Sequence, residues 1–337
     1  MGEGLAVPMN RIHGGPDARP AARWDFSTNA NACGPCPLVL EALRQADATR
    51  YPDPQYGALR TKLADWHGVE SRRILVAASA SEFIVRITGV VARITPGAVR
   101  VPIHSYGDYA AAAHAHGLNV VHEATQAALA WHCDPSSPLG QAAPPNSQRT
   151  NAISVLDLAY TPLRLEGESH WQDAALDALF QLHSPNKALG LTGIRGAYAI
   201  APPDAAPWVT ALEAAAPSWP LGAHAVAMLD AWPNQGTQRW LARSRDTLRA
   251  WKRTQLELFA AMGCQPAPSV ANFFCARWPS ELPLAALREE GIALRDCASF
   301  GLPGWVRASV QPPAAQQALQ RALVRWHDKR SDAEAAH

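Results

Sequence analysis

The sequence predicts an α/β fold in which a large domain with a mostly parallel central sheet is joined to a smaller α+β domain. Three observations lead to this prediction. Short apolar runs alternate with helical patterns from about residue 70 to about residue 200, as in successive βαβ units. After Pro217 two long helical patterns follow each other, and short strand patterns come after them. The chain has 337 residues, which is longer than one compact domain usually is.

The N-terminal part of the chain predicts two helices before the first strand of the sheet. Apolar residues have helical spacing in "LVLEALRQ", directly after Pro37, and in "YGALRTKLADWHG", which ends at Gly68. The strands of the sheet are then expected in "RILVA", "AVRVPI", "LNVV", "NAISVLDLAY", "ALFQLHS" and "RGAYAIAP", with helices over "ASEFIVRITGVVARI" and "GDYAAAAHAHG".

The C-terminal part predicts helices over "LGAHAVAMLDAW" and "TQRWLARSRDTLRAWKRTQLELFAAMG", strands in "ANFFCARW", "GIALRD" and "GWVRASV", and a closing helix over "AAQQALQRALVRW". We therefore expect four segments. Residues 1–50 form an N-terminal arm and part of the small domain, 51–225 the large domain, 226–328 the small C-terminal domain, and 329–337 a flexible tail.

The composition indicates a chain with a large core rather than a polyanion binder. Apolar residues make up 48% and charged residues 18%, which favours a large core over disorder. Lys plus Arg number 30 against 29 acidic residues, so neither nucleic acid nor a membrane is expected as a partner. The start has no signal-peptide pattern, and no apolar run is long enough to span a bilayer. With six scattered cysteines, these features predict a cytoplasmic protein.

The stretch "TNANACGPCP" contains Cys33-Gly-Pro-Cys36, which has the spacing of a thioredoxin-like dithiol. The residues before Cys33 read as a loop rather than a strand. Gly34 and Pro35 suit a turn that leads into the following helix. We interpret the motif as a structural loop. No second cysteine pair or histidine cluster has ligand spacing, so no metal site is expected.

The segment "HSPNKALGLTGIRGAYAI" places Ser184, Lys187 and Arg195 at spacings of three and eight. It resembles the active-site signature of pyridoxal-phosphate-dependent aminotransferases of the aspartate aminotransferase superfamily, which have fold type I. The resemblance implies that Lys187 forms a Schiff base with pyridoxal 5'-phosphate and that Ser184 and Arg195 bind its phosphate. A nucleophilic amine and a rigid cation that holds a dianion suit this chemistry. The alternative is a surface turn with an incidental lysine.

Two further segments resemble parts of the same cofactor site. In "LDLAY", Asp157 would pair with the ring nitrogen of the cofactor, so that the ring takes up electrons from the substrate, and Tyr160 would bind the ring 3'-oxygen. In "HSYGDYAAA", Tyr106 would stack on the ring face. The alternatives are a strand end with unrelated polar residues and a tyrosine that packs in the core.

The stretch "LVAASASEFI" resembles the phosphate cup of the family, where a strand turns into a helix whose first N–H groups face the phosphate. This assigns Ser79, Ala80 and Ser81 to phosphate binding. The same residues form an S-x-x-E capping box, so the helix start and the anion site coincide. Related proteins usually carry Gly-Asn-Gly where this chain has Ala77-Ala78-Ser79.

Two segments resemble the histidinol-phosphate aminotransferase-like subgroup, and a third resembles the Gly-Leu…Arg strand of the wider family. In "RYPDP", Tyr51 would reach the cofactor phosphate of the other subunit, which implies a homodimer with shared active sites. "TNANACGPCP" falls where the subgroup has Asn-x-Asn-Pro-x-Gly-Pro, and Asn31 would face the substrate. In "GLPGWVRASV", Arg307 would bind the substrate carboxylate, unless it is a solvated strand residue.

One segment departs from the family. "CDPSSPLG" lies where the family has Asn-Pro-x-Asn-Pro-x-Gly, so Ser137 replaces the Asn that contacts the ring 3'-oxygen. A serine hydroxyl can still donate one hydrogen bond from a shorter side chain. The expected function is an aminotransferase acting on an amino acid or amino phosphate through Lys187. Two alternatives stay open, a threonine-phosphate decarboxylase of cobalamin biosynthesis and a degenerate cofactor-binding protein with little turnover.

Overall fold

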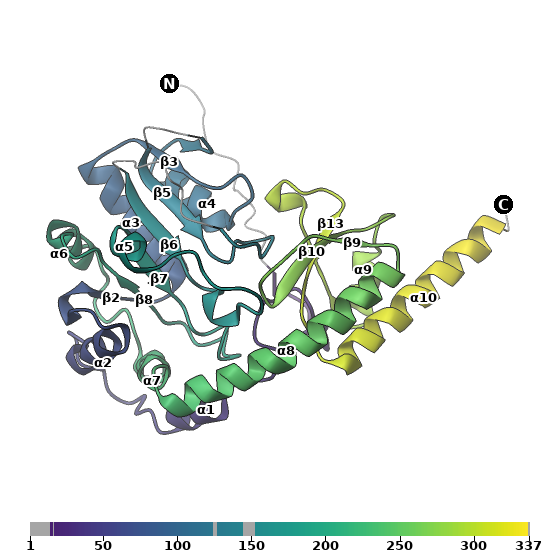
Figure 1. The fold of residues 1–337 in the computed structure, drawn as a ribbon, viewed down its shortest axis with the longest axis horizontal. Coiled ribbons are helices and arrows are strands. Elements are labelled where there is room, and N and C mark those ends of the chain that lie inside the picture. Colours follow the sequence, from purple (N-terminus) through teal and green to yellow (C-terminus); the bar gives the residue numbers. More distant parts are fainter. Residues whose placement is uncertain (1–13, 16, 124–126, 144–151, 336–337) are drawn as a thin grey trace.

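The computed structural model describes residues 14–15, 17–123, 127–143 and 152–335, and its centre is a seven-stranded sheet (Figure 1). The strands follow one another across the sheet in the order β2-β8-β7-β6-β5-β3-β4. In chain order they are β2 (Ile74–Ala77), β3 (Ala98–Arg100), β4 (Val120–Val121), β5 (Ala127–Cys133), β6 (Ile153–Asp157), β7 (Phe180–His183) and β8 (Ala197–Ile200).

The predicted mostly parallel sheet is confirmed. β4, β3, β5, β6 and β7 are parallel neighbours, whereas β8 runs antiparallel to both β7 and β2. Each predicted strand of this sheet is present, but β5 was not predicted. This strand lies between β3 and β6 and pairs with both, with five register pairs to β6. Its sequence, "AALAWHC", is rich in alanine, which has a weak strand preference and therefore gave no signal.

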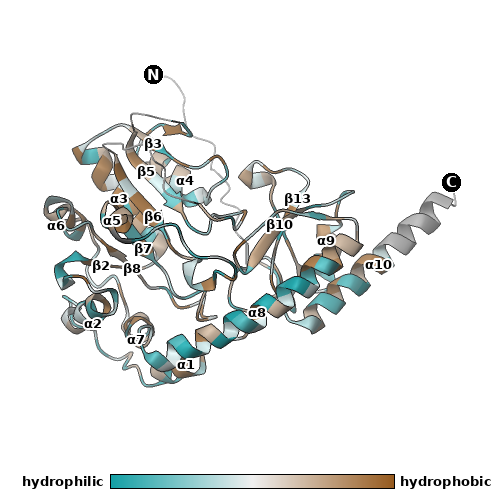
Figure 2. Cartoon of the chain, viewed as in Figure 1, coloured by the Kyte–Doolittle hydropathy of each residue, from teal (hydrophilic) through white to brown (hydrophobic). Residues whose placement is uncertain are grey.

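Helices cover both faces of the sheet, because successive side chains of a strand point to opposite sides. Ile74 and Val76 pack on one face and Leu75 and Ala77 on the other. The first face is covered by α1 (Pro37–Arg44), α2 (Gly57–His67), α7 (Ala223–Ala231) and α8 (Gln235–Ala261). The second face is covered by α3 (Ala80–Ile94), α4 (Gly107–Ala115) and α6 (Ala206–Ala214). Figure 2 shows hydrophobic residues along β5 and β6 between these layers.

A second, antiparallel sheet has the strand order β12-β13-β10-β9. Its strands are β9 (Gln265–Pro266), β10 (Phe273–Arg277), β12 (Arg295–Asp296) and β13 (Trp305–Ser309). α9 (Leu284–Glu289) precedes a separate parallel pair, in which β11 (Ile292–Ala293) binds β1 (Trp24–Asp25). The N-terminal segment therefore joins this smaller unit, and Phe26 lies in its core with Phe259 and Phe274.

Two long helices frame the smaller unit. α8 runs from the helices of the large sheet to the smaller sheet, and α10 (Pro313–Ala335) packs beside it (Figure 1). α10 continues to Ala335, into the segment 329–337 that was expected to be a flexible tail, because this stretch still consists largely of good helix formers. Three 3-10 turns, η1 (Ser71–Arg73), η2 (Thr161–Leu163) and η3 (Ala298–Phe300), and the short helix α5 (Asp173–Asp177) complete the structure. None of the helices among the described residues is long and apolar enough to cross a membrane.

Candidate functional site

The candidate site lies where β6 and β7 end, at the carboxyl edge of the parallel strands, the usual place for ligands in such sheets. Asp157 is the last residue of β6, and Ser184 and Lys187 follow β7 directly. Backbone bonds from Leu189 to Pro185 and from Leu191 to Asn186 fix the turn that carries Lys187. The Lys187 Nζ atom lies 5.3 Å from the centre of the Tyr160 ring. The fold thus brings together the lysine and the two residues predicted from "LDLAY".

Asp157 is buried, and two donors hold its carboxylate. The Tyr109 hydroxyl donates to Oδ2 at 2.7 Å, and the Ala159 backbone N–H donates to Oδ1 at 2.9 Å. Burial raises the pKa of Asp157 above its usual range, while these two bonds and the charge of Lys187 oppose that shift. The carboxylate therefore sits in an environment that favours a further positive partner.

Sequence reasoning missed Tyr109. Its ring is fully buried and stacks on Trp131 with the ring centres 4.5 Å apart. The signal was present, because Tyr109 is the second tyrosine of the segment "HSYGDYAAA". Its role could not be read from the sequence, since Asp157 lies 48 positions away.

Tyr160 is enclosed on several sides. Phe273 of β10 packs edge-on against it with the ring centres 4.7 Å apart. The side-chain amide of Asn29 donates to its hydroxyl oxygen at 3.3 Å. Tyr160 thus lies at the junction of the large sheet, the smaller sheet and the N-terminal segment.

The predicted phosphate cup is the start of α3. The Ser79 hydroxyl accepts a hydrogen bond from the Glu82 N–H at 3.1 Å, so it serves as the helix cap. The N–H groups of Ala80 and Ser81 belong to the first turn, where a helix offers no internal partner. The Ser81 hydroxyl lies 3.2 Å from the Tyr106 hydroxyl, which brings Tyr106 to this helix start. Burial raises the pKa of Tyr106, so its hydroxyl is a neutral group.

Ser184 and Arg195 lie on either side of the Lys187 turn. The Ser184 hydroxyl is buried and has no hydrogen-bond partner within the described ranges. Arg195 is exposed, at the start of the segment that leads into β8. A buried hydroxyl without a partner costs free energy, and a bound ligand oxygen would remove that cost.

Asn31 is placed against the Lys187 turn. Its backbone N–H donates to the Lys187 carbonyl at 2.9 Å, and its Nδ2 donates to the Ala188 carbonyl at 3.0 Å. Its Oδ1 accepts a hydrogen bond from the Cys33 N–H at 3.0 Å. The amide that was predicted to face the substrate therefore makes bonds on both ends that hold the loop on the turn.

The Cys33–Cys36 segment is the loop that leads into α1. Cys36 is buried and forms the N-cap position of that helix, with Pro37 in the first turn. Burial raises the pKa of the Cys33 thiol, and both cysteines are free. A raised thiol pKa is the opposite of what a reactive dithiol needs. This geometry agrees with the interpretation as a structural loop.

Arg307 of β13 has Arg295 of β12 as its register partner. The two guanidinium groups lie 5.6 and 4.8 Å from the centre of the Phe300 ring, and both residues are buried. Burial and the neighbouring Arg307 lower the pKa of Arg295. Sequence reasoning predicted Arg307 and missed Arg295, whose position follows from strand pairing alone. Two buried guanidinium groups side by side favour a nearby negative charge.

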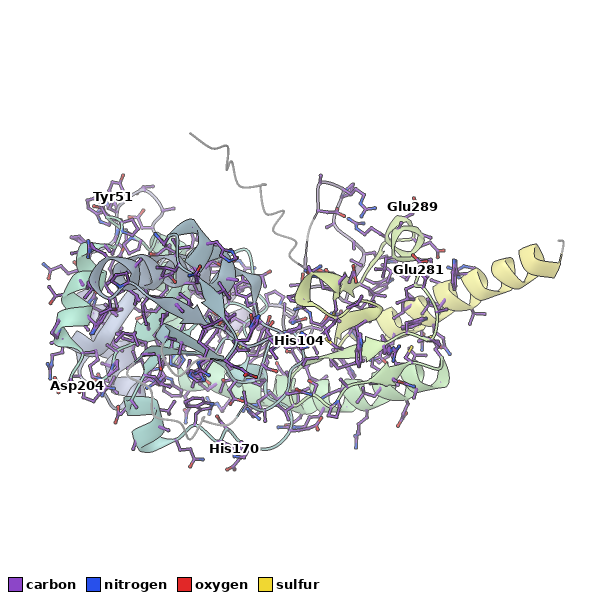
Figure 3. All side chains as sticks on the ribbon, turned by 90° about the horizontal axis from the view of Figure 1, so that it is seen from above. Tyr51, His104, His170, Asp204, Glu281 and Glu289 are labelled. Atoms are coloured by element: carbon purple, nitrogen blue, oxygen red, sulfur yellow. The ribbon has the colours of Figure 1, made fainter. Side chains whose placement is uncertain are left out.

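The N-terminal segment passes directly over Arg307. The Arg307 guanidinium donates to the Ser27 carbonyl at 3.1 Å. A Cβ atom on Gly14 would lie 2.2 Å from the Ser27 oxygen and 3.0 Å from Arg307 Nη2, so only glycine fits there. A second contact connects the large domain to the smaller unit, where His104 Nδ1 lies 2.7 Å from the Phe300 carbonyl oxygen (Figure 3).

Ser137 lies in the loop after β5. The Asp134 N–H donates to the Asp157 carbonyl at 3.1 Å, so this loop lies beside the end of β6. A buried ion pair between Asp134 and Arg164, at 2.6 Å, holds the loop in place. Ser137 itself is buried, and the Ser137–Pro138 peptide bond is cis.

Tyr51 lies at the surface of the large domain. Its side chain is 79% exposed and stacks on Trp219, with the ring centres 4.6 Å apart. In Figure 3 it lies at the edge of the large domain, far from His104 near the site. The one ring contact recorded for Tyr51 among the described residues is with Trp219, and none with the Lys187 turn is recorded.

The chain is similar to known proteins along almost its whole length. The family model described as aminotransferase class I and II matches residues 24–325. A histidinol-phosphate aminotransferase from Hyphomonas neptunium is 27% identical over 345 aligned residues, which cover 90% of this chain and 89% of that protein.

Solved structures share the fold. The L-threonine-O-3-phosphate decarboxylase from Porphyromonas gingivalis superposes with a TM-score of 0.74 at 22% identity, over 90% of this chain and 99% of that one. The histidinol-phosphate aminotransferase from Sinorhizobium meliloti, in complex with pyridoxal-5'-phosphate, gives 0.73 at 21% identity over 90% of each chain. These similarities establish the predicted aspartate-aminotransferase-like α/β fold.

Proposed function

The chain belongs to the class I and II aminotransferase family, and on that basis we propose that it is a pyridoxal-phosphate-dependent aminotransferase acting on an amino acid or an amino phosphate. One observation carries the proposal. The Lys187 amine lies over the Tyr160 ring, beside the buried carboxylate of Asp157, at the carboxyl edge of the sheet. A primary amine next to a buried acid suits a residue that holds an aldehyde cofactor covalently.

The residues of the site fit this cofactor. Asp157, a buried carboxylate that accepts hydrogen bonds from Tyr109 and Ala159, suits a cationic ring nitrogen. The Ser184 hydroxyl, buried without a partner among the described residues, suits a phosphate oxygen. The first turn of α3 offers N–H groups at a helix N-terminus, which favours an anion. In our proposal Tyr106 covers the ring face, Tyr160 and Ser137 serve the ring oxygen, and Ser79, Ala80, Ser81, Ser184 and Arg195 serve the phosphate.

Each residue then has a defined task. When bound, the cofactor takes up the electrons of the bond that breaks at the substrate Cα. Lys187, once its amine is free, accepts and returns the Cα proton as a general base and acid. Arg307 binds the substrate carboxylate with a planar pair of N–H groups, and Asn31 holds the loop that borders the lysine.

The substrate class follows from the paired arginines. Arg295 places a second buried guanidinium beside Arg307, which suits a substrate with a phosphate or second carboxylate. The similarity to histidinol-phosphate aminotransferases supports an amino phosphate. We further propose a homodimer in which the exposed side chain of Tyr51 reaches the partner's site, and a cytoplasmic location.

Two alternatives are kept. Similarity to a threonine-phosphate decarboxylase fold favours a decarboxylase as the second candidate, because the same lysine and arginine would serve it. A protein that binds the cofactor with little turnover is the third.

Borohydride reduction of the cofactor-loaded protein followed by peptide mapping tests the site, and label on a lysine other than Lys187 would contradict it. Mass analysis of products from a panel of amino donors, including histidinol phosphate and threonine phosphate, separates transamination from decarboxylation.

A further inference from the structure

We propose that Asn29 is a positioning residue that commits the Tyr160 hydroxyl to donating a hydrogen bond to the cofactor ring oxygen. The inference rests on the proposed function and adds to it a residue that sequence reasoning did not assign. It is carried by a buried contact between the N-terminal loop and the end of the β6 region, with Asn29 Nδ2 at 3.3 Å from the Tyr160 hydroxyl oxygen.

The direction of this hydrogen bond decides what Tyr160 can do. A tyrosine hydroxyl has one hydrogen to donate and lone pairs that accept. Because the Asn29 amide donates to the hydroxyl oxygen, the hydroxyl hydrogen cannot point back at Asn29. It stays available for another acceptor. A donor that also accepts a hydrogen bond is strengthened by it, so Asn29 makes Tyr160 a better donor as well.

The surroundings of the pair leave little freedom for another arrangement. Asn29 is 2% exposed and Tyr160 is 8% exposed, so water does not compete for their bond. The edge-on contact with Phe273 restricts the Tyr160 ring, and the Lys187 amine lies over the same ring. The hydroxyl is thus held in one place, on the side of the molecule where Lys187 acts.

Asn29 is itself held by the smaller unit. The Nδ2 atom of Asn272, at the start of β10, donates to the backbone carbonyls of Asn29 and Ala30 at 3.3 and 3.2 Å. Asn272 is fully buried, and its backbone carbonyl accepts a hydrogen bond from the Val310 N–H at 2.8 Å. The loop that carries Asn29 is therefore fixed to the strands that carry Arg307, and Tyr160 is fixed to both.

The test uses the cofactor-loaded full chain and two readouts that do not need turnover. These are the pH midpoint of the visible absorbance of the bound cofactor and its dissociation constant. The titrating proton is held on the imine nitrogen of the bound cofactor by the negative charge of the ring oxygen. A hydrogen-bond donor to that oxygen weakens this hold, so a good donor lowers the midpoint. Asn29→Ala should raise the midpoint by about 0.5–1 pH unit and weaken cofactor binding about 3- to 10-fold.

Two further variants make the test specific. Asn29→Asp keeps the shape but can only accept when ionised, so it draws the hydroxyl hydrogen to itself and should raise the midpoint at least as much. In a Tyr160→Phe background, Asn29→Ala should add no further shift, because the residue through which it acts is gone. Circular dichroism checks that each variant is folded. If Asn29→Ala does not fold, the isosteric Asn29→Asp variant provides the test.

The outcomes separate this inference from the proposed function. A wild-type chain that takes up no pyridoxal phosphate, as seen by the absence of a visible band, overturns both. A wild-type chain with a titrating band whose midpoint does not move in either Asn29 variant overturns the positioning role alone. A shift that persists in the Tyr160→Phe background also overturns it, since Asn29 would then act without Tyr160.

Discussion

The Tyr109 hydroxyl donates a hydrogen bond of 2.7 Å to the carboxylate of Asp157, deep between α4 and the central sheet. Both groups are buried, so the bond is made in a medium that screens charge poorly. It is one of the contacts that lower the pKa of Asp157 against the effect of burial. Tyr109 thereby helps to keep this carboxylate ionised.

Tyr109→Phe should weaken cofactor binding, because the Asp157 carboxyl loses a donor and its pKa rises further. A hydrogen bond to a charged group contributes roughly 1.5–3 kcal/mol, so we expect a loss of about 10- to 100-fold in affinity. Equilibrium titration with pyridoxal phosphate measures it. The size of the ring is preserved, so packing on Trp131 serves as an internal control. Unchanged affinity at pH 7 and pH 5 would show that the bond does not tune Asp157.

Arg307→Lys and Arg295→Lys should weaken the recognition of different groups of the substrate. A lysine cannot reproduce the two parallel bonds of a guanidinium to a carboxylate. We expect kcat/KM to fall roughly 10- to 100-fold in either variant. The loss in Arg307→Lys should extend to all amino acid donors, whereas that in Arg295→Lys should be confined to donors with a phosphate. Equal losses on every donor would contradict separate roles.

Mixed dimers test the role of Tyr51. Tyr51→Phe and Lys187→Ala chains should each be crippled, and mixing them after mild dissociation should restore part of the activity, because one of the two sites in a mixed dimer is intact. Activity is measured against the mixing ratio. A protein that is monomeric in solution and binds its cofactor fully would rule out the shared site.

Acid should destabilise the fold through a buried histidine cluster. His67 donates to or accepts from the Tyr198 hydroxyl at 2.8 Å, and its ring lies 4.8 Å from that of His183. Burial lowers the pKa of His67 to about 4, and burial also lowers the pKa of His183 well below its ordinary value. Both histidines bind protons more readily in the unfolded chain, so stability is complete above pH 6.5 and is lost as pH falls toward 4.

His67→Gln keeps a polar partner for Tyr198 and removes one of the two titrating rings. The free energy of unfolding should then fall less between pH 6.5 and pH 4, by roughly 1–3 kcal/mol. Urea unfolding at several pH values provides the measurement. A variant whose stability falls as steeply as that of the wild type would exclude His67 as a source of acid sensitivity.

The Cys33 and Cys36 pair should have no catalytic part. Cys33→Ser/Cys36→Ser should keep turnover within about twofold, in reducing and in oxidising buffer alike, because both residues lie in the loop before α1 and the Cys36 thiol makes no capping hydrogen bond there. A steady-state assay in both buffers decides this. A loss of activity in one buffer only would restore the dithiol interpretation.

The sequence was most informative where local patterns are strong. The alternation of strands and helices predicted the central sheet, and the capping box at Ser79 predicted the start of α3. The alanine-rich β5 escaped, because its strand conformation depends on its two neighbours rather than on its own side chains.

The site was harder to predict where a role depends on contacts across the fold. Asn29, Tyr109 and Arg295 were not assigned, since each acts on a partner from another element. Asn31 was expected to face the substrate, and only the structure reveals that both ends of its amide bond to the loop and the lysine turn. The part of Asn31 in substrate binding stays a prediction.

The pairing of β1 with β11 sets the order in which the molecule can be assembled. Trp24 pairs with Ile292, so a strand made early in synthesis finds its partner only when most of the chain exists. Closing so long a loop is entropically slow compared with forming the βαβ units. We therefore expect the central sheet to form first and the N-terminal segment, with Gly14 and Asn29, to dock last. A nascent chain that ends before β11 would have a folded sheet and an incomplete site.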